Sequence, residues 1–379
     1  MAFYVKDQLY FDFYLNGYSI PITLADINSL LIVSNRFDIL PTLRLDINDT
    51  KNIFDKGALT DGAIISIAVG NNEENALKNM MEFMYVSSPS ESVKRSANRY
   101  LIYAIYNFPK FIYCQEPFGF HGTSSQCLKT LAEKCGLGFD GISTVDEMTW
   151  LNGNMKYGQF SKFVTQHGFS NDSSLMESCI DLKRILRYRD LHAVKPEYTF
   201  TDAPVANVDV EKRITLKEIF FKNIASSNNS TFGYSSQMVD YNLDGTASIE
   251  SQIAFDKTTG VVNVNKNSYD LSGVVRNEIR PTNIGNFHPN WVKAYYQNKR
   301  YNALDSIQAE VYIENAAPVE VLDAVKINLM NPMTVSPDTV KAQNWIVSAK
   351  TMAISSRSYL EKYMLTTSGI EVDLFNTLM

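Results

Sequence analysis

The sequence predicts a mainly β protein with two antiparallel β-barrel units and an α+β unit between them. Near the N-terminus, apolar and polar side chains alternate over residues 43–48, and a turn at 61–62 opens an apolar strand over 64–69. Near the C-terminus, the same alternation occurs over 311–314 and an apolar strand follows over 325–329. A period of two places one face of a strand on a core and the other in solvent. The shared strand chemistry indicates two similar barrels, although strand, turn, strand patterns are common in all-β proteins.

The first unit is expected over residues 1–116 as a closed or nearly closed barrel. Side chains alternate in polarity over 9–15 and end at the Gly17 turn. The next strand starts over 20–22, where a proline suits an edge or entry position. Further strand sequence follows over 98–114 and is interrupted by a proline, so the unit reads as β throughout.

The second unit, over residues 117–195, changes from strand to helix periodicity. A helix is predicted over 124–135, where two serines can cap the start, an apolar stripe follows one side and Gly136 stops the helix. A second helix is predicted over 157–167 and a hairpin over 179–191. The mixture of both periods predicts an α+β unit that could hold a cleft.

The strand pattern of a second barrel resumes after this unit. Strands are predicted over 214–221, 345–350 and 359–366, with a turn-like connection over 353–358. A stretch rich in Ser and Asn interrupts the pattern and predicts an insertion that loops out. The predicted units are a first barrel at 1–116, an α+β domain at 117–195, a second barrel at 196–221 and 301–370, an insertion at 222–300 that packs with the α+β domain, and a C-terminal tail at 371–379.

Composition and charge describe a multi-part protein with ample material for its cores. The chain has 379 residues, of which 45% are hydrophobic. It carries 35 Lys plus Arg against 41 Asp plus Glu, which gives a formal net charge of −6. A surface that holds nucleic acid needs clustered cations, so this balance argues against one. It suits a surface that nucleic acid slides past.

Aromatic residues are more numerous than the packing of small barrels usually demands. The chain has 21 Tyr, 21 Phe and 3 Trp, and Tyr is favoured where a face is buried against a partner. The Tyr-rich segments Tyr295-Tyr296, Tyr301 and Tyr359 to Tyr363 are candidate contact residues. Packing within a β-rich core is the alternative for each of them.

The four cysteines and four histidines show no spacing typical of a metal site. Cys127 and Cys135 fall on roughly one side of a predicted helix, but no His or carboxylate stands near them at ligand spacing. We therefore expect no metal and no cofactor. The sequence starts without a secretory signal and has no apolar run near the ~18 residues of a membrane span, so we expect no membrane contact. The cysteines are then expected as small buried residues in a reducing cytoplasm.

Several segments, in the expected order, resemble one protein family. They resemble the baseplate central hub (tail hub) proteins of contractile-tailed bacteriophages, and the match spans nearly the whole chain. The first barrel is matched by 17–22, 43–46 and 62–67, the α+β domain by 127–136, 148–152 and 186–191, and the closing hairpin of the second barrel by 345–355 and 359–367.

The resemblance implies a structural virion protein that assembles as a homotrimer. The two barrels of each chain would alternate around a ring of pseudo-sixfold symmetry at the centre of the baseplate. The implied partners are the membrane-piercing tail spike, the tail tube protein, the tape measure protein and the baseplate wedge proteins. DNA would pass through the channel without specific binding, and assembly would take place in the cytoplasm of the bacterial host. A phage-derived injection particle is equally compatible with the resemblance.

Two other functions stay open at this stage. In a cell-wall hydrolase of the tail tip, Asp140 with Asp146 or Glu147 could serve as an acid and base pair. The sequence has no Gly-x-Ser-x-Gly, His-Glu-x-x-His or phosphate loop, and turn chemistry explains these carboxylates better. We therefore assign no catalytic residue and expect no enzyme. A carbohydrate-binding adhesion module would need a compact aromatic cluster, whereas the aromatics are spread along the chain.

Overall fold

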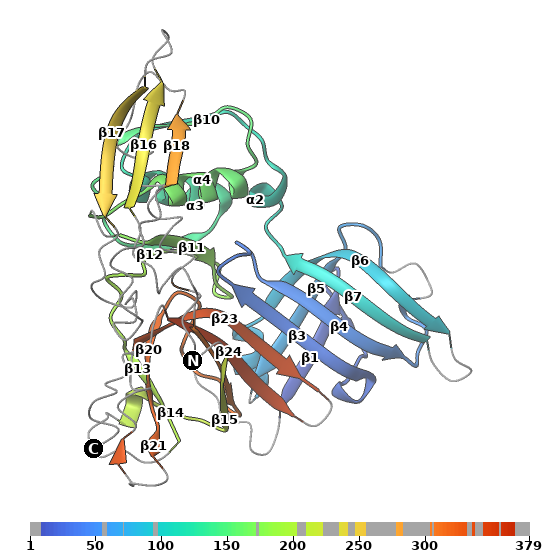
Figure 1. Ribbon diagram of the computed structural model, residues 1–379. Coiled ribbons are helices and arrows are strands. Elements are labelled where there is room, and N and C mark those ends of the chain that lie inside the picture. Colours follow the sequence, from blue (N-terminus) through green and yellow to red (C-terminus); the bar gives the residue numbers. More distant parts are fainter. Residues whose placement is uncertain are drawn as a thin grey trace.

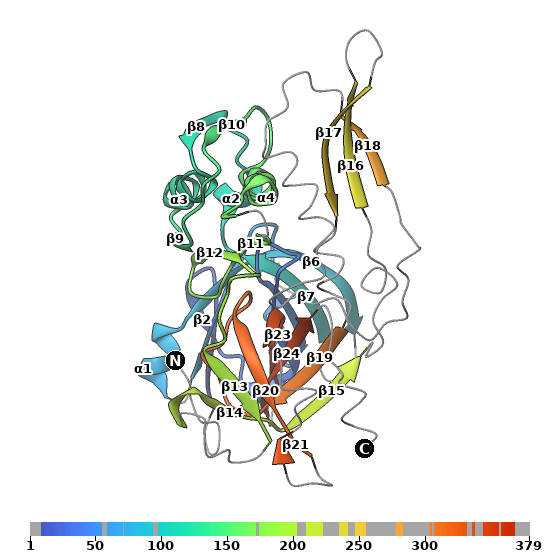
Figure 2. The ribbon, with the colours of Figure 1, turned by 60° about the vertical axis from the view of Figure 1, so that its left-hand side comes forward.

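One large, strongly curled β-sheet dominates the computed structural model of the chain (Figures 1 and 2). Fourteen strands of the described part of the chain belong to it, which confirms the mainly β prediction. The structure describes residues 9–54, 59–70, 72–93, 98–171, 174–202, 210–222, 235–241, 247–254, 278–282, 304, 307–331, 336–337, 344–355 and 358–367.

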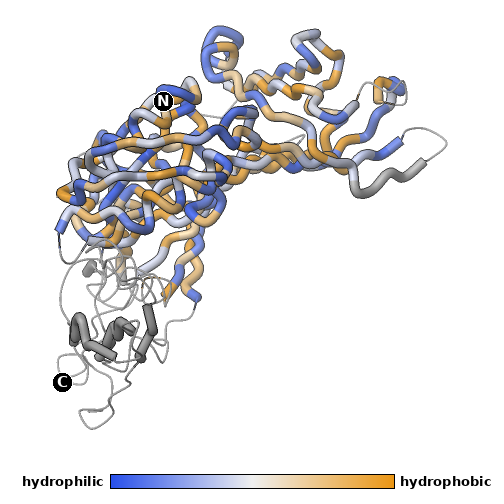
Figure 3. Tube along the Cα trace, turned by 90° about the horizontal axis from the view of Figure 1, so that it is seen from above, coloured by the Kyte–Doolittle hydropathy of each residue, from blue (hydrophilic) through white to orange (hydrophobic). Residues whose placement is uncertain are grey.

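Seven N-terminal strands form one half of the large sheet. Their spatial order is β2-β1-β5-β6-β7-β4-β3, and all neighbours are antiparallel. Leu43, Leu45 and Ile47 of β4 are buried while Arg44 points outward, as the period of two predicted, and Figure 3 shows the alternation of hydropathy along the strands. The strands are β1 (Tyr10–Leu15), β2 (Tyr18–Ile20), β3 (Ile27–Asn35), β4 (Thr42–Asp49), β5 (Ile64–Gly70), β6 (Met81–Val93) and β7 (Asn98–Tyr106), with η1 (Leu24–Asp26) before β3 and α1 (Glu73–Lys78) before β6.

The C-terminal strands close into a barrel. In sequence order they are β13 (Tyr198–Thr201), β14 (Arg213–Thr215), β15 (Glu218–Lys222), β19 (Ile307–Ile313), β20 (Ala324–Asn328), β23 (Asn344–Ile354) and β24 (Tyr359–Thr367), with η3 (Val210–Lys212) before β14. One path of pairing runs β15-β19-β24-β23-β20-β13-β14. The two ends of that path, β14 and β15, are joined in the chain by residues 216–217. The path closes there, because the Leu216 amide donates to the Thr201 carbonyl of β13 and the Lys217 amide to the Tyr312 carbonyl of β19. Phe200, Trp345 and Tyr363 fill the interior.

Two details of this barrel differ from the prediction. The single strand expected over 214–221 is divided into β14 and β15, because the chain there leaves one neighbour, β13, and joins another, β19. The barrel is also not wholly antiparallel, since β13 runs parallel to both β14 and β20. Connections longer than a hairpin turn precede and follow β13, which is what a parallel pair requires.

The eleven-residue strand β23 belongs to both halves of the sheet. Residues 346–354 pair with β24 along one edge. Along its other edge, residues 344–346 pair with β20 and residues 349–354 pair with β3. The register shift between Val347 and Ala349 lies where the partner changes. The edge of β3 is thereby covered, and one hydrogen-bonded sheet runs through both β units.

Residues 109–190 form the α+β part. The helices α3 (Ser124–Cys135) and α4 (Tyr157–His167) are confirmed, and Gly136 ends α3 with a φ of 75°. The predicted caps of α3 are wrong: Thr123, and not one of the two serines, caps its start, because the Thr123 side chain accepts from the Gln126 amide. The hairpin is also confirmed, as β11 (Met176–Ile180) and β12 (Ile185–Asp190). The strand predicted to continue to residue 114 is wrong, because α2 (Pro109–Tyr113) begins with the proline, which suits a first helical turn. The part also contains β8 (Phe118–Gly122), β9 (Gly138–Gly141) and β10 (Met148–Asn152), with β8 paired to β10 and β9 parallel to β12.

The predicted insertion contains a small sheet of its own. The strands β16 (Ser235–Tyr241), β17 (Ala247–Ala254) and β18 (Glu278–Thr282) form it, and Figure 2 shows them standing off from the large sheet. The short strands β21 (Met330–Asn331) and β22 (Ser336–Pro337) form a further pair. No helix among the described residues is long and apolar enough to cross a membrane.

Candidate functional site

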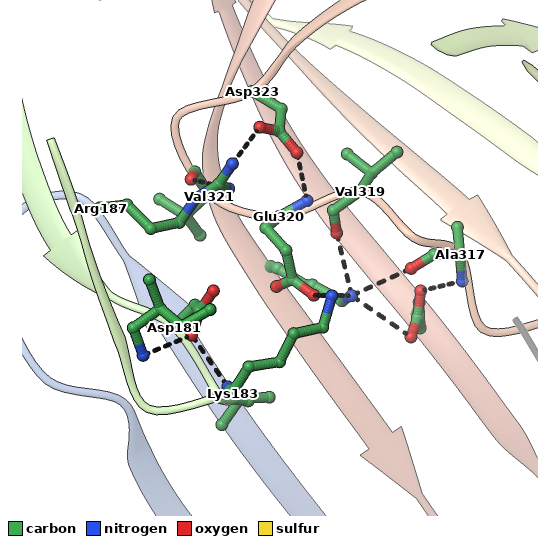
Figure 4. A network of polar contacts seen from close by, with 12 residues as sticks. Asp181, Lys183, Arg187, Ala317, Val319, Glu320, Val321 and Asp323 are labelled. Carbon is green, nitrogen blue, oxygen red and sulfur yellow. Dashed lines mark hydrogen bonds and ion pairs between the residues drawn. The ribbon is translucent and has the colours of Figure 1, made fainter. Parts of the chain in front are cut away.

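The parts of the fold meet at the connection between β19 and β20, residues 314–323, which we call the joint loop. Charged side chains from three strands reach this loop (Figure 4). They are Arg187 of β12, Lys350 of β23 and Glu361 of β24, whose residues are at most 8% exposed. The α+β part and the strands β23 and β24 are therefore held at one place.

Arg187 attaches the α+β part to the joint loop. One guanidinium nitrogen donates to the Val321 carbonyl at 3.0 Å, and the other pairs with Asp323 at 2.6 Å. The second oxygen of Asp323 accepts from the Glu320 amide at 2.8 Å, which ties the loop to itself. A buried guanidinium whose donors are used in this way fixes both the distance and the angle between the two parts.

Lys350 and Glu361 hold the other end of the loop. The Lys350 ammonium donates to the carbonyls of Ala317 and Val319, at 3.2 and 2.9 Å. It also lies 3.7 Å from Glu361 and 3.6 Å from Glu320. Glu361 accepts from the Ala317 amide at 3.0 Å. The carboxylate therefore binds the N–H of Ala317, and the ammonium of Lys350 binds the carbonyl of the same residue.

Two tyrosine hydroxyls complete the surroundings of Glu361. The Tyr359 hydroxyl donates to one carboxylate oxygen at 2.6 Å and the Tyr363 hydroxyl to the other at 2.5 Å. Burial, followed by the charge of Glu361, raises the pKa of both tyrosines well above 10.0. Burial alone would lower the pKa of Lys350, but the charges of Glu320 and Glu361 outweigh it and hold that pKa above 10.5. At pH 7 the Lys350 side chain is therefore charged and the two tyrosine hydroxyls are uncharged.

The joint loop also contains a strained residue. Leu322 is fully buried and has a φ of 75°, in the left-handed region that a leucine rarely adopts. Its amide donates to the Val347 carbonyl of β23 at 2.9 Å. Such a conformation persists only where its surroundings enforce it. Here the bonds of Arg187 and β23 on either side of Leu322 supply that constraint.

A cavity of about 310 Å³ adjoins the network. Its wall includes Lys350, Glu361 and Tyr359, together with residues of α1, of the start of β6 and of the β11–β12 turn. Glu320, Lys350 and Glu361 of this wall have their partners within the network, whereas Lys78 pairs with Glu74 and Arg184 with Glu82. The arrangement is suited to holding three parts of a chain in one orientation.

The carboxylates considered for an acid and base pair have separate structural contacts. Asp146 is buried and accepts from the backbone amides of Ser124 and Phe169, at 2.8 and 2.7 Å. Asp140 pairs with Arg189, and Glu147 is exposed, 3.5 Å from His121. The structure therefore gives each a different neighbour and does not place them around one site.

The candidate contact tyrosines were not confirmed where they can be checked. Tyr359 and Tyr363 are 3% and 0% exposed, so core packing explains them. Tyr295, Tyr296 and Tyr301 lie outside the described residues. Cys127 and Cys179 are buried, as expected, whereas Cys114 and Cys135 are half-buried. The described residues contain no group of three or more His, Cys, Asp or Glu that could hold a metal.

We expect Arg187→Met to lower the free energy of unfolding by about 3–5 kcal/mol, because it leaves Asp323 and a buried carbonyl without their donor. Arg189→Met is the matched control, two residues along the same strand. Its partner Asp140 is half exposed, so that loss should stay below about 1 kcal/mol. Urea denaturation of the three proteins measures both values, and equal losses would contradict the role of Arg187.

The network also predicts a loss of stability at alkaline pH. Because the folded pKa of Lys350 is raised, its contribution is complete below its unfolded value of 10.5 and is lost as the pH rises through the folded pKa. The raised pKa values of Tyr359 and Tyr363 also lower the stability as the pH rises above 10.0. The free energy of unfolding should therefore fall between pH 10 and 12, by up to about 1.4 kcal/mol per pH unit for each group.

The contribution of Lys350 to this fall can be separated by substitution. Lys350→Met should make the slope shallower, while Lys326→Met, at an exposed position of β20, should keep the slope of the unaltered protein. Denaturant titrations at each pH measure the slopes. The same slope in all three proteins would show that Lys350 does not titrate as described.

Comparison with known proteins agrees with this architecture. No protein-family model and no curated protein sequence matches the chain significantly. Among solved structures, the 43 kDa tail protein of prophage MuSo2 from Shewanella oneidensis is similar with a TM-score of 0.60 and 10% identity, over 95% of this chain and 99% of that one. The tail protein from Neisseria meningitidis MC58 gives 0.58 and 9%, over 96% and 97%.

A third similar structure is a chain of the half-lidded Francisella PdpA–VgrG complex. It has a TM-score of 0.52 and 8% identity, and the match covers 96% of this chain but 59% of that one. Likeness at such low identity is a likeness of fold. The chain therefore has the fold of phage tail proteins, as its resemblance to baseplate hub proteins predicted.

Proposed function

We propose that three copies of this chain form the central hub of a phage baseplate. The ring would connect the tail tube to the membrane-piercing spike and enclose the channel for the tape measure protein and DNA. Two tail proteins of similar fold support a structural role in the virion. The occurrence of the fold in a PdpA–VgrG complex supports contact with other assembly components. The baseplate wedge proteins would bind the outside of the ring.

The observation that carries this proposal is the pairing of β23 with β3. It joins an N-terminal and a C-terminal β unit into one hydrogen-bonded sheet within each chain. Three such chains supply six β units, which is the number needed to match a sixfold tail tube. A wall of paired backbones is rigid, and a ring of such units leaves few free strand edges.

Cations that are paired with carboxylates, in both β halves, suit a channel through which DNA passes. In the N-terminal half, Arg99 forms a two-pronged contact with Asp46. In the C-terminal barrel, Glu310 pairs with Lys222 at 2.5 Å and with Lys362 at 2.8 Å. A cation that is neutralised by a neighbouring carboxylate adds little salt-dependent affinity for phosphate.

The purified protein is expected to be a trimer, alone or with its spike. Light scattering should give the mass of three chains at micromolar concentration, and electron microscopy should show a ring with a central hole. The permanent interfaces of such a ring bury large areas, so dilution to nanomolar concentration should not dissociate it. A monomer at micromolar concentration in the presence of the spike would contradict the proposal.

A further inference from the structure

The cavity of about 310 Å³ beside the joint loop has cations at its mouth. Lys78 of α1 and Lys183 and Arg184 of the β11–β12 turn belong to its wall, and each of these side chains is more than half exposed. Lys350 and Glu361 belong to the same wall but are buried. The cavity therefore has a positively charged mouth and a floor formed by the charged network.

Apolar side chains from separate parts of the chain line the same cavity. Val69, Met81 and Met352 are buried, Leu182 is half-buried and Met80 is exposed. Methionine is flexible and adapts its shape to the group it packs against. Ligand sites commonly lie between parts of a chain and combine apolar walls with a few charged groups. The composition of this cavity is typical of such a site.

Arg184 stands at the mouth in a strained backbone conformation. Its φ of 65° lies in the left-handed region, which glycine adopts at lower cost. The Arg184 amide donates to the Asp181 carbonyl at 3.2 Å, and the Asp181 carboxylate accepts from the Lys183 amide at 2.9 Å. These bonds hold the turn without the guanidinium, which lies 4.8 Å from the centre of the Phe108 ring. A strained arginine where glycine would form the same turn indicates a function for the guanidinium itself.

The three cations at the mouth form weak ion pairs. These pairs are Lys78–Glu74 at 2.6 Å, Lys183–Glu320 at 3.9 Å (Figure 4) and Arg184–Glu82 at 3.6 Å. An ion pair with a solvent-exposed cation contributes little free energy, so the side chain can exchange its partner. An anion that enters the mouth is shielded from water by the cavity wall and competes well for these cations.

We propose that this cavity binds a small organic anion, with an apolar body and a phosphate or carboxylate head. The head would lie among Lys78, Lys183 and Arg184, and the body against Met81 and Met352. Such a ligand would contact α1, the β11–β12 turn and β23 at once, so its binding would stabilise their arrangement. The proposal does not depend on the assembly of three copies.

Nuclear magnetic resonance of the full chain, labelled with 13C at the methionine methyl groups, tests this inference. Phenyl phosphate and benzoate are the probes, and the one that binds more tightly identifies the head. We expect that probe, at millimolar concentration, to shift the signals of Met80, Met81 and Met352. Met148 and Met176 are not among the residues of the wall, and their signals should stay unchanged. Inorganic phosphate and benzyl alcohol, which supply the head or the body alone, should bind more weakly.

Substitutions at the mouth test the role of the cations. Arg184→Gly should weaken the binding of the tighter probe about fivefold, and Lys183→Ala about threefold, as expected for half-exposed ion pairs. The urea denaturation midpoint of Arg184→Gly should match that of the unaltered protein, because glycine adopts this φ without strain. Arg44→Ala is the matched control, since the Arg44 guanidinium lies 5.8 Å from the centre of the Tyr103 ring and outside the cavity. It should leave the affinity unchanged.

Each of the other outcomes contradicts part of the proposal. If neither probe shifts the three methionine signals of the wall, the cavity is not a ligand site. Inorganic phosphate that binds as tightly as the better probe would show an adventitious ion only, and equally tight benzyl alcohol would remove the role of the cations. A lower urea midpoint of Arg184→Gly with unchanged affinity would assign Arg184 to the fold instead of to binding.

Discussion

The pairing of β23 with three neighbouring strands is the constraint on which the rest of the structure depends. Its C-terminal part pairs with β3 of the N-terminal half, and its N-terminal part closes the C-terminal barrel against β20. Backbone hydrogen bonds in a ladder fix register as well as distance, since a slip by one residue would turn every side chain to the opposite face. The two β units are consequently not separate bodies joined by a linker. They share one strand and one sheet.

The charged network at the joint loop also restricts how the connected parts of the chain can rotate against one another. Apolar packing alone tolerates small rotations of one part against another, whereas buried ionic groups have few acceptable geometries. Arg187 binds the loop from the α+β part, and Lys350 with Glu361 binds it from the shared sheet. Burying these charges costs desolvation energy, which the surrounding carbonyls and hydroxyls offset. We interpret the network as a contact that fixes the orientation of the α+β part relative to the shared sheet.

Local patterns in the sequence predicted much of the fold, because the responsible interactions are local. The two long helices were predicted from their apolar stripes and stop signals, β4 from alternation, β5 from its apolar run and β24 from its strand-forming residues. The division into β14 and β15 and the parallel position of β13 were not predicted, since partner choice depends on residues far away in the chain. The short helix α2 was not predicted, because a proline after a strand pattern can end the strand as well as begin a helix.

The charged network escaped prediction for the same reason, although a signal was present. Lys350 and Glu361 occupy positions of β23 and β24 whose neighbours two residues away are buried, for example Tyr359 and Tyr363. A charged residue at a strand position that shares its face with buried neighbours indicates a buried ionic contact. The sequence does not indicate which residues meet it, and the joint loop showed no pattern of its own. The abundance of tyrosine suggests an interface, whereas the positions of Tyr359 and Tyr363 on the inward side of β24 place both in the core.

Amide hydrogen exchange of β23 tests the central claim most directly. If one sheet runs through both β units, the amides of residues 349–354 should exchange as slowly as those of residues 344–347 and of β4, because all of them open only with the whole structure. Faster exchange of residues 349–354, through local separation from β3 while both halves stay protected, would contradict the account.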